Sequence, residues 1–277
     1  MHSEALLITA IVLLAAVVAL ATLLLRQRQA QLMLRREVER LRDVAKQRAD
    51  QVSILSHEVR TPLALIRGSA ALLAEQSPGE LNEVQERFVQ TISNSANHVI
   101  SLAEDLLITA RIEAGLFEVQ LRRVQLRSVL RSVVRELRVV HRRDIVLDTP
   151  GPPARVLLDP SLITQLIGKL VANSLRHDPD TSNVVSIRGH IAEGSVIISV
   201  SDSGRGMTEE ERTAIFGRFH STAALGQGSG LGLYICRHIA ELHGGSIHVD
   251  TIAHFGTTMV VTFPTGDSAT SETGGAR

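Results

Sequence analysis

The sequence predicts an α+β protein in three parts: an N-terminal transmembrane helix, a helical hairpin that pairs with a second copy into a four-helix bundle, and a C-terminal α/β two-layer sandwich. An uncharged apolar run covers residues 5–25. Two long stretches with helical spacing of apolar residues follow, and short strand-like runs alternate with helices after Val119. We expect segment boundaries at 1–25, 26–50, 51–115, 116–264 and 265–277, the last a disordered Ser-, Thr- and Gly-rich tail.

Composition narrows the class of protein. The chain of 277 residues has 29 basic and 29 acidic side chains, and this balance argues against a general nucleic-acid binder. Aromatic residues make up 3% and Trp is absent, which argues against stacking platforms for bases or sugars. Because Cys236 is the only cysteine, no internal disulfide can form, and a fold that faces the cytosol is favoured.

The apolar run 5–25 predicts a single membrane-spanning helix, since 21 residues at 1.5 Å each extend about 31 Å. A cleaved signal peptide is the alternative, although the first four residues, Met-His-Ser-Glu, offer no basic n-region. Eight basic against three acidic residues in 26–48 place the N-terminus outside and the rest in the cytoplasm, at the inner or plasma membrane. The basic cluster either contacts anionic membrane lipid or only sets topology.

Beyond the membrane, apolar residues recur at alternating spacings of four and three. This pattern predicts a parallel coiled coil between two copies of the chain, with a single amphipathic helix lying on the protein body as the alternative. The seam residues are Leu34, Val38, Leu41, Ala45, Val52, Leu55 and Val59.

A helical hairpin follows the seam. Helical spacing continues to Leu73, stops at the turn 76–79, and resumes over 80–114. Two such hairpins make a four-helix bundle. The first helix carries His57 just before Pro62, which removes a backbone donor and permits local bending.

Two side chains near His57 suit chemistry at its imidazole. Glu58 follows directly, and a carboxylate there can hold the tautomer and accept a proton as Nε2 attacks an electrophile. Thr61 lies four residues on, on the same helix face, where its hydroxyl can position water. The run Ser-His-Glu-Val-Arg-Thr-Pro-Leu resembles the phosphoacceptor box of bacterial sensor histidine kinases. The resemblance implies that His57 is autophosphorylated, that Glu58 is the base, and that Thr61 helps to dephosphorylate the partner.

The C-terminal half predicts a sandwich whose helices cover one face of a sheet. Expected helices span 126–137, 161–177, 208–216 and 231–242, and expected strands span 145–147, 155–158, 184–189, 196–201, 246–250 and 257–263. The runs 184–201 and 246–263 are expected to be antiparallel hairpins.

Two segments predict a nucleotide site. On the helix 161–177, Asn173 offers an amide oxygen to Mg²⁺, and Arg176 or His177 can meet a phosphate chain. After the strand 196–201, Asp202 can accept a hydrogen bond from the exocyclic amine of adenine.

Glycines and an apolar pair extend this pattern. Gly204 and Gly206 let the backbone approach a base, and Phe216 is expected to pack the base of a lid. A glycine-rich run opens the next helix with bare backbone amides that suit phosphate. That run contributes Gly228, Gly230, Leu231 and Gly232, and a turn near Thr257 completes the set.

The order of these segments resembles the N, G1, F and G2 boxes of the histidine-kinase ATPase domain of the GHKL type, shared with gyrase-type and Hsp90-type ATPases. The resemblance implies ATP and Mg²⁺ as cofactors and covers residues 51–264. One position departs from the pattern: Lys169 stands where a second Asn is common, four residues before Asn173. An ammonium there either competes with Mg²⁺ or contacts phosphate.

The resemblance implies a membrane-anchored, homodimeric two-component sensor histidine kinase. It would phosphorylate His57 from ATP, transfer the phosphoryl group to an aspartate of a response-regulator receiver domain, and also dephosphorylate that partner. Two alternatives remain open at this point: a protein dominated by its phosphatase activity, and a scaffold that binds ATP with little kinase activity.

Overall fold

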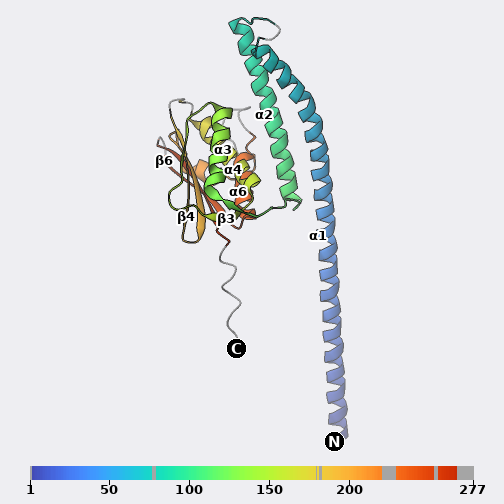
Figure 1. Ribbon diagram of the computed structural model, residues 1–277. Coiled ribbons are helices and arrows are strands. Elements are labelled where there is room, and N and C mark those ends of the chain that lie inside the picture. The colour runs from blue at the N-terminus through green and yellow to red at the C-terminus, as the bar shows by residue number, and fades with distance from the viewer. Residues whose placement is uncertain are drawn as a thin grey trace.

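The computed structural model describes residues 2–76, 79–178, 180, 183–219, 229–252 and 255–266, with side chains from residue 22 onward. Its N-terminal half is a hairpin of α1 (His2–Ala74) and α2 (Glu83–Glu113) (Figure 1). α2 begins at a capping box, in which the side chain of Asn82 accepts the Gln85 N–H at 3.0 Å and the Gln85 side chain accepts the Asn82 N–H at 2.9 Å. The predicted hairpin is therefore present, with residues 77–78 of its turn outside the described range.

The first helix continues through Pro62 rather than ending there. Thr61 Oγ1 donates to the carbonyl of His57 at 3.2 Å, a bond of a threonine side chain back to the preceding turn, whereas the carbonyl that loses its backbone donor at Pro62 is that of Glu58. The helix bends toward its C-terminal end (Figure 1). His57 and Glu58 both project into solvent.

Within the described residues, no helix has a segment apolar and long enough to cross a bilayer. The predicted span 5–25 lies mostly on residues whose side chains are outside the described set.

The C-terminal half combines a five-stranded sheet, a two-stranded sheet and four helices among its described residues. The five-stranded sheet has the order β2-β4-β5-β7-β6, with β2 parallel to β4 and all other neighbours antiparallel. The small sheet pairs β1 with β3. In chain order the elements are β1 (Arg122–Gln125), α3 (Leu126–His141), β2 (Ile145–Asp148), β3 (Arg155–Leu158), α4 (Pro160–His177), β4 (Val185–Ala192), β5 (Ser195–Asp202), α5 (Glu209–Ala214), α6 (Gly232–Leu242), β6 (Ser246–Ile252) and β7 (Gly256–Pro264).

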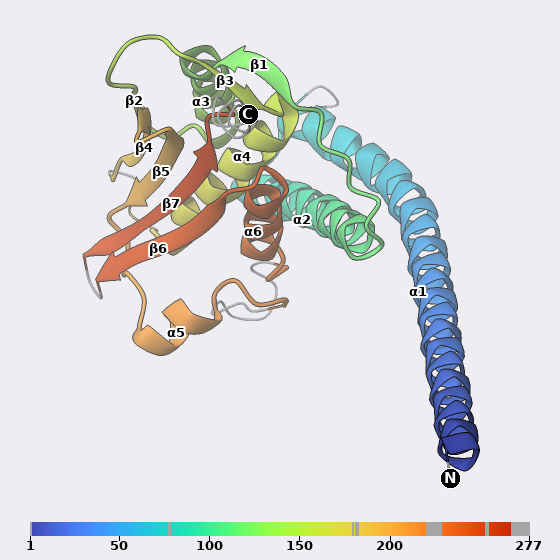
Figure 2. The same cartoon turned by 90° about the horizontal axis from the view of Figure 1, so that it is seen from below.

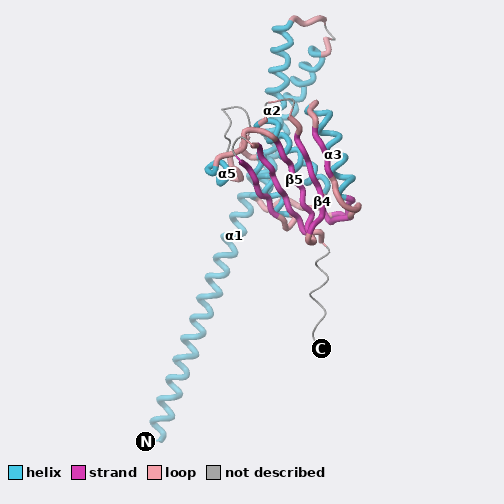
Figure 3. Tube along the Cα trace, turned by 90° about the vertical axis from the view of Figure 1, so that its left-hand side faces the viewer, coloured by secondary structure: helices cyan, strands magenta, loops and turns pink. Residues whose placement is uncertain are grey.

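Helices α3, α4 and α6 lie behind the sheet, whose other face is open to the viewer in Figure 3. Alternate residues of the strands point into this layer; on β5, for example, Val196, Ile198 and Val200 are fully buried. They pack against apolar residues of the helices, including Leu166 and Ile235, both 0% exposed. This single core holds the C-terminal end of α4 next to the C-terminal end of β5 and the N-terminal end of β7.

The predicted secondary structure is largely confirmed. All six expected strands are present, and β4–β5 and β6–β7 form the two expected hairpins. Strand β1 is not predicted by the sequence, because three of its four residues are exposed and two of them are arginines. The predicted tail lies almost wholly outside the described residues.

The hairpin stands beside the sandwich, and α2 lies between α1 and the sandwich in both Figure 1 and Figure 2. α2 contacts α6, and the exposed ion pair between Glu113 and Arg218, at 2.5 Å, joins the end of α2 to the segment after α5. One flank of α2 therefore faces the nucleotide-site residues predicted from the sequence.

Candidate nucleotide-binding site

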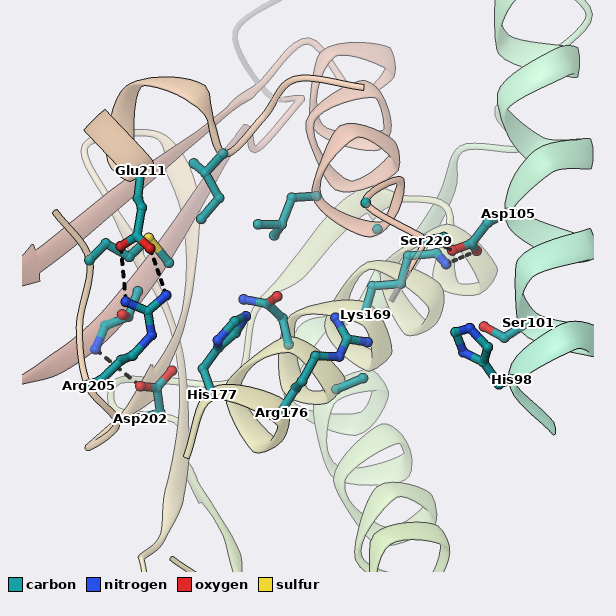
Figure 4. A pocket seen from close by; sticks show the side chains of 18 of the residues that line it. His98, Ser101, Asp105, Lys169, Arg176, His177, Asp202, Arg205, Glu211 and Ser229 are labelled. Carbon is teal, nitrogen blue, oxygen red and sulfur yellow. Dashed lines mark hydrogen bonds and ion pairs between the residues drawn. The ribbon is translucent and has the colours of Figure 1, made fainter. Parts of the chain in front are cut away.

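A cavity lies where α2, α4, α6 and the ends of β5 and β7 meet (Figure 4). It gathers residues from separate predicted segments, so the structure brings these segments together. The predicted residues that line it are Asn173, Arg176, His177, Asp202, Gly206, Gly230, Gly232 and Thr257.

The Asp202 carboxylate is oriented by the backbone around it. Its Oδ1 accepts the N–H of Gly204 at 3.1 Å and the N–H of Thr257 at 3.2 Å. Its Oδ2 accepts no hydrogen bond from any residue in the described part of the chain. A carboxylate held in this way at a cavity is suited to accept a hydrogen bond from an amine such as that of adenine.

Two glycines make this arrangement possible. A Cβ on Gly204 would lie 2.8 Å from the carbonyl oxygen of His177, so a larger residue would separate this loop from α4. Gly256 has φ +98°, and a Cβ there would lie 2.1 Å from the carbonyl oxygen of Asp202. Both positions require glycine because backbone approaches backbone at the floor of the cavity.

The C-terminal turns of α4 supply one side of the cavity. Burial lowers the pKa of the Arg176 guanidinium, and the negative charge of Asp105 opposes that shift. Burial, followed by the positive charges of Arg176 and Arg205, also lowers the pKa of His177. The neutral form of the His177 ring is therefore favoured, and Arg176 supplies positive charge one turn after Asn173.

The start of α6 supplies the opposite side. Gly230 has φ +65° and turns the chain into the helix, and the Leu231 N–H donates to Ser229 Oγ at 3.2 Å. Leu231, the residue that precedes the helix, offers no side-chain cap to the first turn. This end of α6 therefore presents backbone donors at the cavity wall, the arrangement that favours phosphate oxygens.

Several predicted residues do not line the cavity. Leu231 is fully buried and Phe216 packs on the core, while Gly204 acts through the close approach described above. Gly228 lies outside the described residues.

The predicted phosphoacceptor residues are not part of the cavity. His57, Glu58 and Thr61 belong to α1, and α2 stands between α1 and the sandwich (Figure 2). Ser56, next to His57, donates to the carbonyl of Ala103 on α2 at 3.3 Å, so this turn of α1 is held to the hairpin partner.

The structure adds residues that sequence reasoning missed. Four come from α2, namely His98, Ser101, Leu102 and Asp105, and no motif in the sequence connects them to a nucleotide site. Arg205 lies within a recognised motif that gives it no role; it donates to Glu211 at 2.7 Å beside the cavity. Lys169 departs from the resembled pattern, and the structure places its ammonium against Asp105.

Comparison with known families agrees with this geometry. The phosphoacceptor domain family "His Kinase A" matches residues 47–115, and the family "Histidine kinase-, DNA gyrase B-, and HSP90-like ATPase" matches residues 158–267. These two ranges contain the His57 box and the cavity residues of the sandwich, respectively.

Individual proteins similar to this chain are sensor kinases. The chain is 29% identical over 226 residues to the sensor histidine kinase WalK of Bacillus subtilis, covering 79% of this chain and 37% of WalK. It is 34% identical over 214 residues to the sensor protein kinase PmrB of Pseudomonas aeruginosa, covering 76% of this chain and 44% of PmrB. The chain thus spans less than half the length of these relatives.

A solved structure is similar to this chain in both fold and sequence. Full-length ShkA in complex with AMPPNP superposes with a TM-score of 0.62 at 28% identity, covering 78% of this chain and 45% of ShkA. With a phosphoacceptor hairpin and a GHKL-type ATPase sandwich in one chain, this protein belongs to the sensor histidine kinases of two-component systems.

Proposed function

We propose that this protein is a membrane-anchored histidine kinase that binds ATP with Mg²⁺ in the cavity, phosphorylates His57 and passes the phosphoryl group to an aspartate of a response regulator. The observation that carries the proposal is the cavity itself. It holds an oriented carboxylate, Asp202, together with Arg176 and the open first turn of α6. A hydrogen-bond acceptor for a base and donors for phosphates thus share one site.

The transfer step needs one proton acceptor and one leaving group. The Nε2 lone pair of His57 attacks the γ-phosphorus, the bond from that phosphorus to the β,γ-bridging oxygen breaks, and ADP leaves with the electron pair. Glu58, the adjacent residue on α1, would take the imidazole proton. Such transfer depends chiefly on positioning and on neutralising charge, which Arg176 and the α6 turn are placed to provide.

The proposal includes Mg²⁺ on the chemistry of the donors. Asn173 offers an amide oxygen in the cavity, and Mg²⁺ usually takes one or two protein oxygens and completes its shell with phosphates and water. Within the described residues, no cluster of three or more His, Cys, Asp or Glu side chains is placed to hold a metal ion. Asn173 would therefore act with the phosphates rather than within an all-protein cage.

We also propose that the protein is a homodimer, anchored by residues 5–25 with its catalytic part in the cytoplasm. Apolar side chains on the seam of α1, such as Leu34, Leu41 and Leu55, are each at least 60% exposed in the single chain. A second copy would cover them. The excess of basic residues in 26–48 supports the cytoplasmic side and contact with anionic lipid.

The partner would be a response-regulator receiver domain, as membership in the two-component family suggests. Removal of phosphate from that partner is part of the proposal, because Thr61 stands one turn after His57. Direct contact with nucleic acid is not expected, since the chain carries no basic excess.

The test is labelling of the full chain in detergent micelles with γ-labelled ATP and Mg²⁺. We expect acid-labile, base-stable label on the wild type and none on His57→Gln. His248→Gln is the matched control, because His248 is an exposed histidine on β6, and its label should equal that of the wild type. Label retained by His57→Gln would overturn the assignment of the acceptor, and no label on the wild type would overturn the kinase activity.

A further inference from the structure

One buried carboxylate joins the helical hairpin to two elements of the ATPase sandwich. Asp105 on α2 is 5% exposed, and both of its oxygens are engaged (Figure 4). Oδ1 pairs with the ammonium of Lys169 on α4, and Oδ2 accepts the hydroxyl of Ser229, at the start of α6, at 2.9 Å. We call these three residues the Asp105 clamp.

The clamp is the buried polar part of this interface. Among the described residues a second ion pair crosses it, Glu113 with Arg218, but both of these side chains are at least 40% exposed, and exposed pairs of this kind contribute little. The Lys169 and Asp105 side chains are only 16% and 7% exposed. A buried charge of this kind is costly unless its partner stays in place, so the clamp favours one docked position of the sandwich on α2.

The clamp also lies within the nucleotide cavity. Asp105, Lys169 and Ser229 line the same space as Asn173 and Arg176. The Asp105 carboxylate is bound by an ammonium and by a hydroxyl that precedes the first turn of α6, and groups of these kinds also bind a phosphate oxygen. Asp105 therefore accepts hydrogen bonds from Lys169 and Ser229, two donors that an anionic ligand in the cavity would also need.

We propose that Asp105 is a built-in competitor for the phosphates of the bound nucleotide. Lys169 and Ser229 bind Asp105 in the docked arrangement and exchange it for phosphate oxygens when ATP binds. Lys169 is thereby a phosphate-binding residue of this chain, and loss of the clamp frees the sandwich from α2. This inference rests on the proposed binding of ATP in the cavity.

The exchange has a consequence for phosphoryl transfer. In the docked arrangement α2 lies between α1 and the sandwich (Figure 2), and His57, which belongs to α1, is not among the residues that line the cavity. Because ATP would remove the contact that holds this arrangement, nucleotide binding and release of the sandwich toward a phosphoacceptor histidine are coupled. The coupling is reciprocal: weakening the clamp must tighten the binding of ATP.

The first experiment compares Asp105→Asn with Glu104→Gln in the full chain in detergent micelles. Both changes remove one negative charge from adjacent positions of α2, but Glu104 pairs with Arg60 of α1 at 3.0 Å, within the hairpin. Calorimetric titration with Mg²⁺ and ATP, and separately with adenosine, gives the dissociation constants.

We expect Asp105→Asn to tighten ATP binding by about fivefold or more. Glu104→Gln should stay within about twofold of the wild type, and adenosine, which lacks phosphate, should bind Asp105→Asn and the wild type alike. Equal ATP affinity of wild type and Asp105→Asn, or weaker binding by Asp105→Asn, would overturn the inference alone. Absence of ATP binding by the wild type and both variants would contradict the proposed function, and this inference with it.

A second comparison tests whether Lys169 binds phosphate once the Asp105 carboxylate has been removed. In the Asp105→Asn background, Lys169→Met should weaken ATP binding by about fivefold or more and leave adenosine binding unchanged. If Lys169 only held the interface, its removal from this background would not change the ATP dissociation constant, and that result would refute its role as a phosphate ligand.

Discussion

At the scale of single residues, Lys169 and His177 show how position changes chemistry. Lys169 stands where the resembled motif commonly has asparagine, and the sequence leaves its role open between metal and phosphate. The structure directs its ammonium to Asp105, a residue 64 positions earlier in the chain. The sequence predicts that Arg176 or His177 meets phosphate, and the structure shows that burial and two neighbouring arginines lower the pKa of His177 and so favour its neutral form.

His177 should make the folded protein sensitive to mild acid. In the unfolded chain the pKa of a histidine is about 6.5, and in the folded protein the pKa of His177 is lower. As pH falls through about 6.5 the unfolded state binds more protons than the folded state, so the free energy of unfolding decreases. We expect His177→Gln to lose part of the difference in stability between about pH 7.5 and about pH 5.5.

Urea unfolding at the two pH values measures this effect, with His248→Gln as the control. His248 is exposed on β6, away from the cavity, so its variant should keep the full wild-type difference. An undiminished difference in His177→Gln would contradict the prediction.

At the scale of elements, hydrophobic spacing predicted nearly every helix and strand, whereas pairing depended on contacts between distant segments. β1 escaped prediction because it is short and largely exposed, and only its pairing with β3 makes it a strand. The sequence also could not predict that β7 lies between β5 and β6, or that β2 joins β4 in parallel. The order of the strands depends on which strand faces are buried together against α3, α4 and α6.

Two glycines illustrate the difference between local and tertiary requirements. Gly168 lies inside α4, and a Cβ added there would meet nothing within 4 Å apart from its chain neighbours and the adjacent backbone of its own helix, so Gly168→Ala should stabilise the fold by about 0.5–1 kcal/mol through helix propensity. Gly245 lies just before β6, where a Cβ would come 1.9 Å from the carbonyl oxygen of Thr262. Gly245→Ala should therefore destabilise by about 2 kcal/mol or more.

Thermal unfolding of the two alanine variants beside the wild type checks both signs. The same substitution is expected to raise the melting temperature at one position and lower it at the other. A lower melting temperature for Gly168→Ala, or an unchanged one for Gly245→Ala, would contradict the space expected around the added Cβ at that position.

At the scale of the whole molecule, the hairpin carries apolar surface that one chain does not cover. On α2, Phe88 is 64% exposed and Ile92 is 47% exposed, and on α1, Leu65 is 70% exposed. Burial of such side chains stabilises by about 1.5–3 kcal/mol each, which favours a second copy as their partner. The two-chain bundle expected from the sequence remains our proposal.

Phe88→Glu should weaken this dimer by placing a charge on its apolar face. We expect the full chain in micelles to shift from dimer to monomer at a protein concentration at which the wild type is dimeric. Light scattering after size-exclusion chromatography measures the protein mass. Arg87→Glu, a charge change at the adjacent exposed position, should remain dimeric; a dimeric Phe88→Glu or a monomeric wild type would contradict the proposal.

The sequence by itself determined the family, and it predicts a phosphoacceptor box around His57 and most of the sandwich residues that line the cavity, because each of these depends on residue types at short fixed spacings. Tertiary structure decided which of these residues share a space. It brought α2 to the mouth of the cavity, placed Asp105 between Lys169 and Ser229, and kept His57 on the far side of α2. These contacts join residues 64 and 124 positions apart, and no local pattern records them, since they arise only when the surfaces of the hairpin and the sandwich meet.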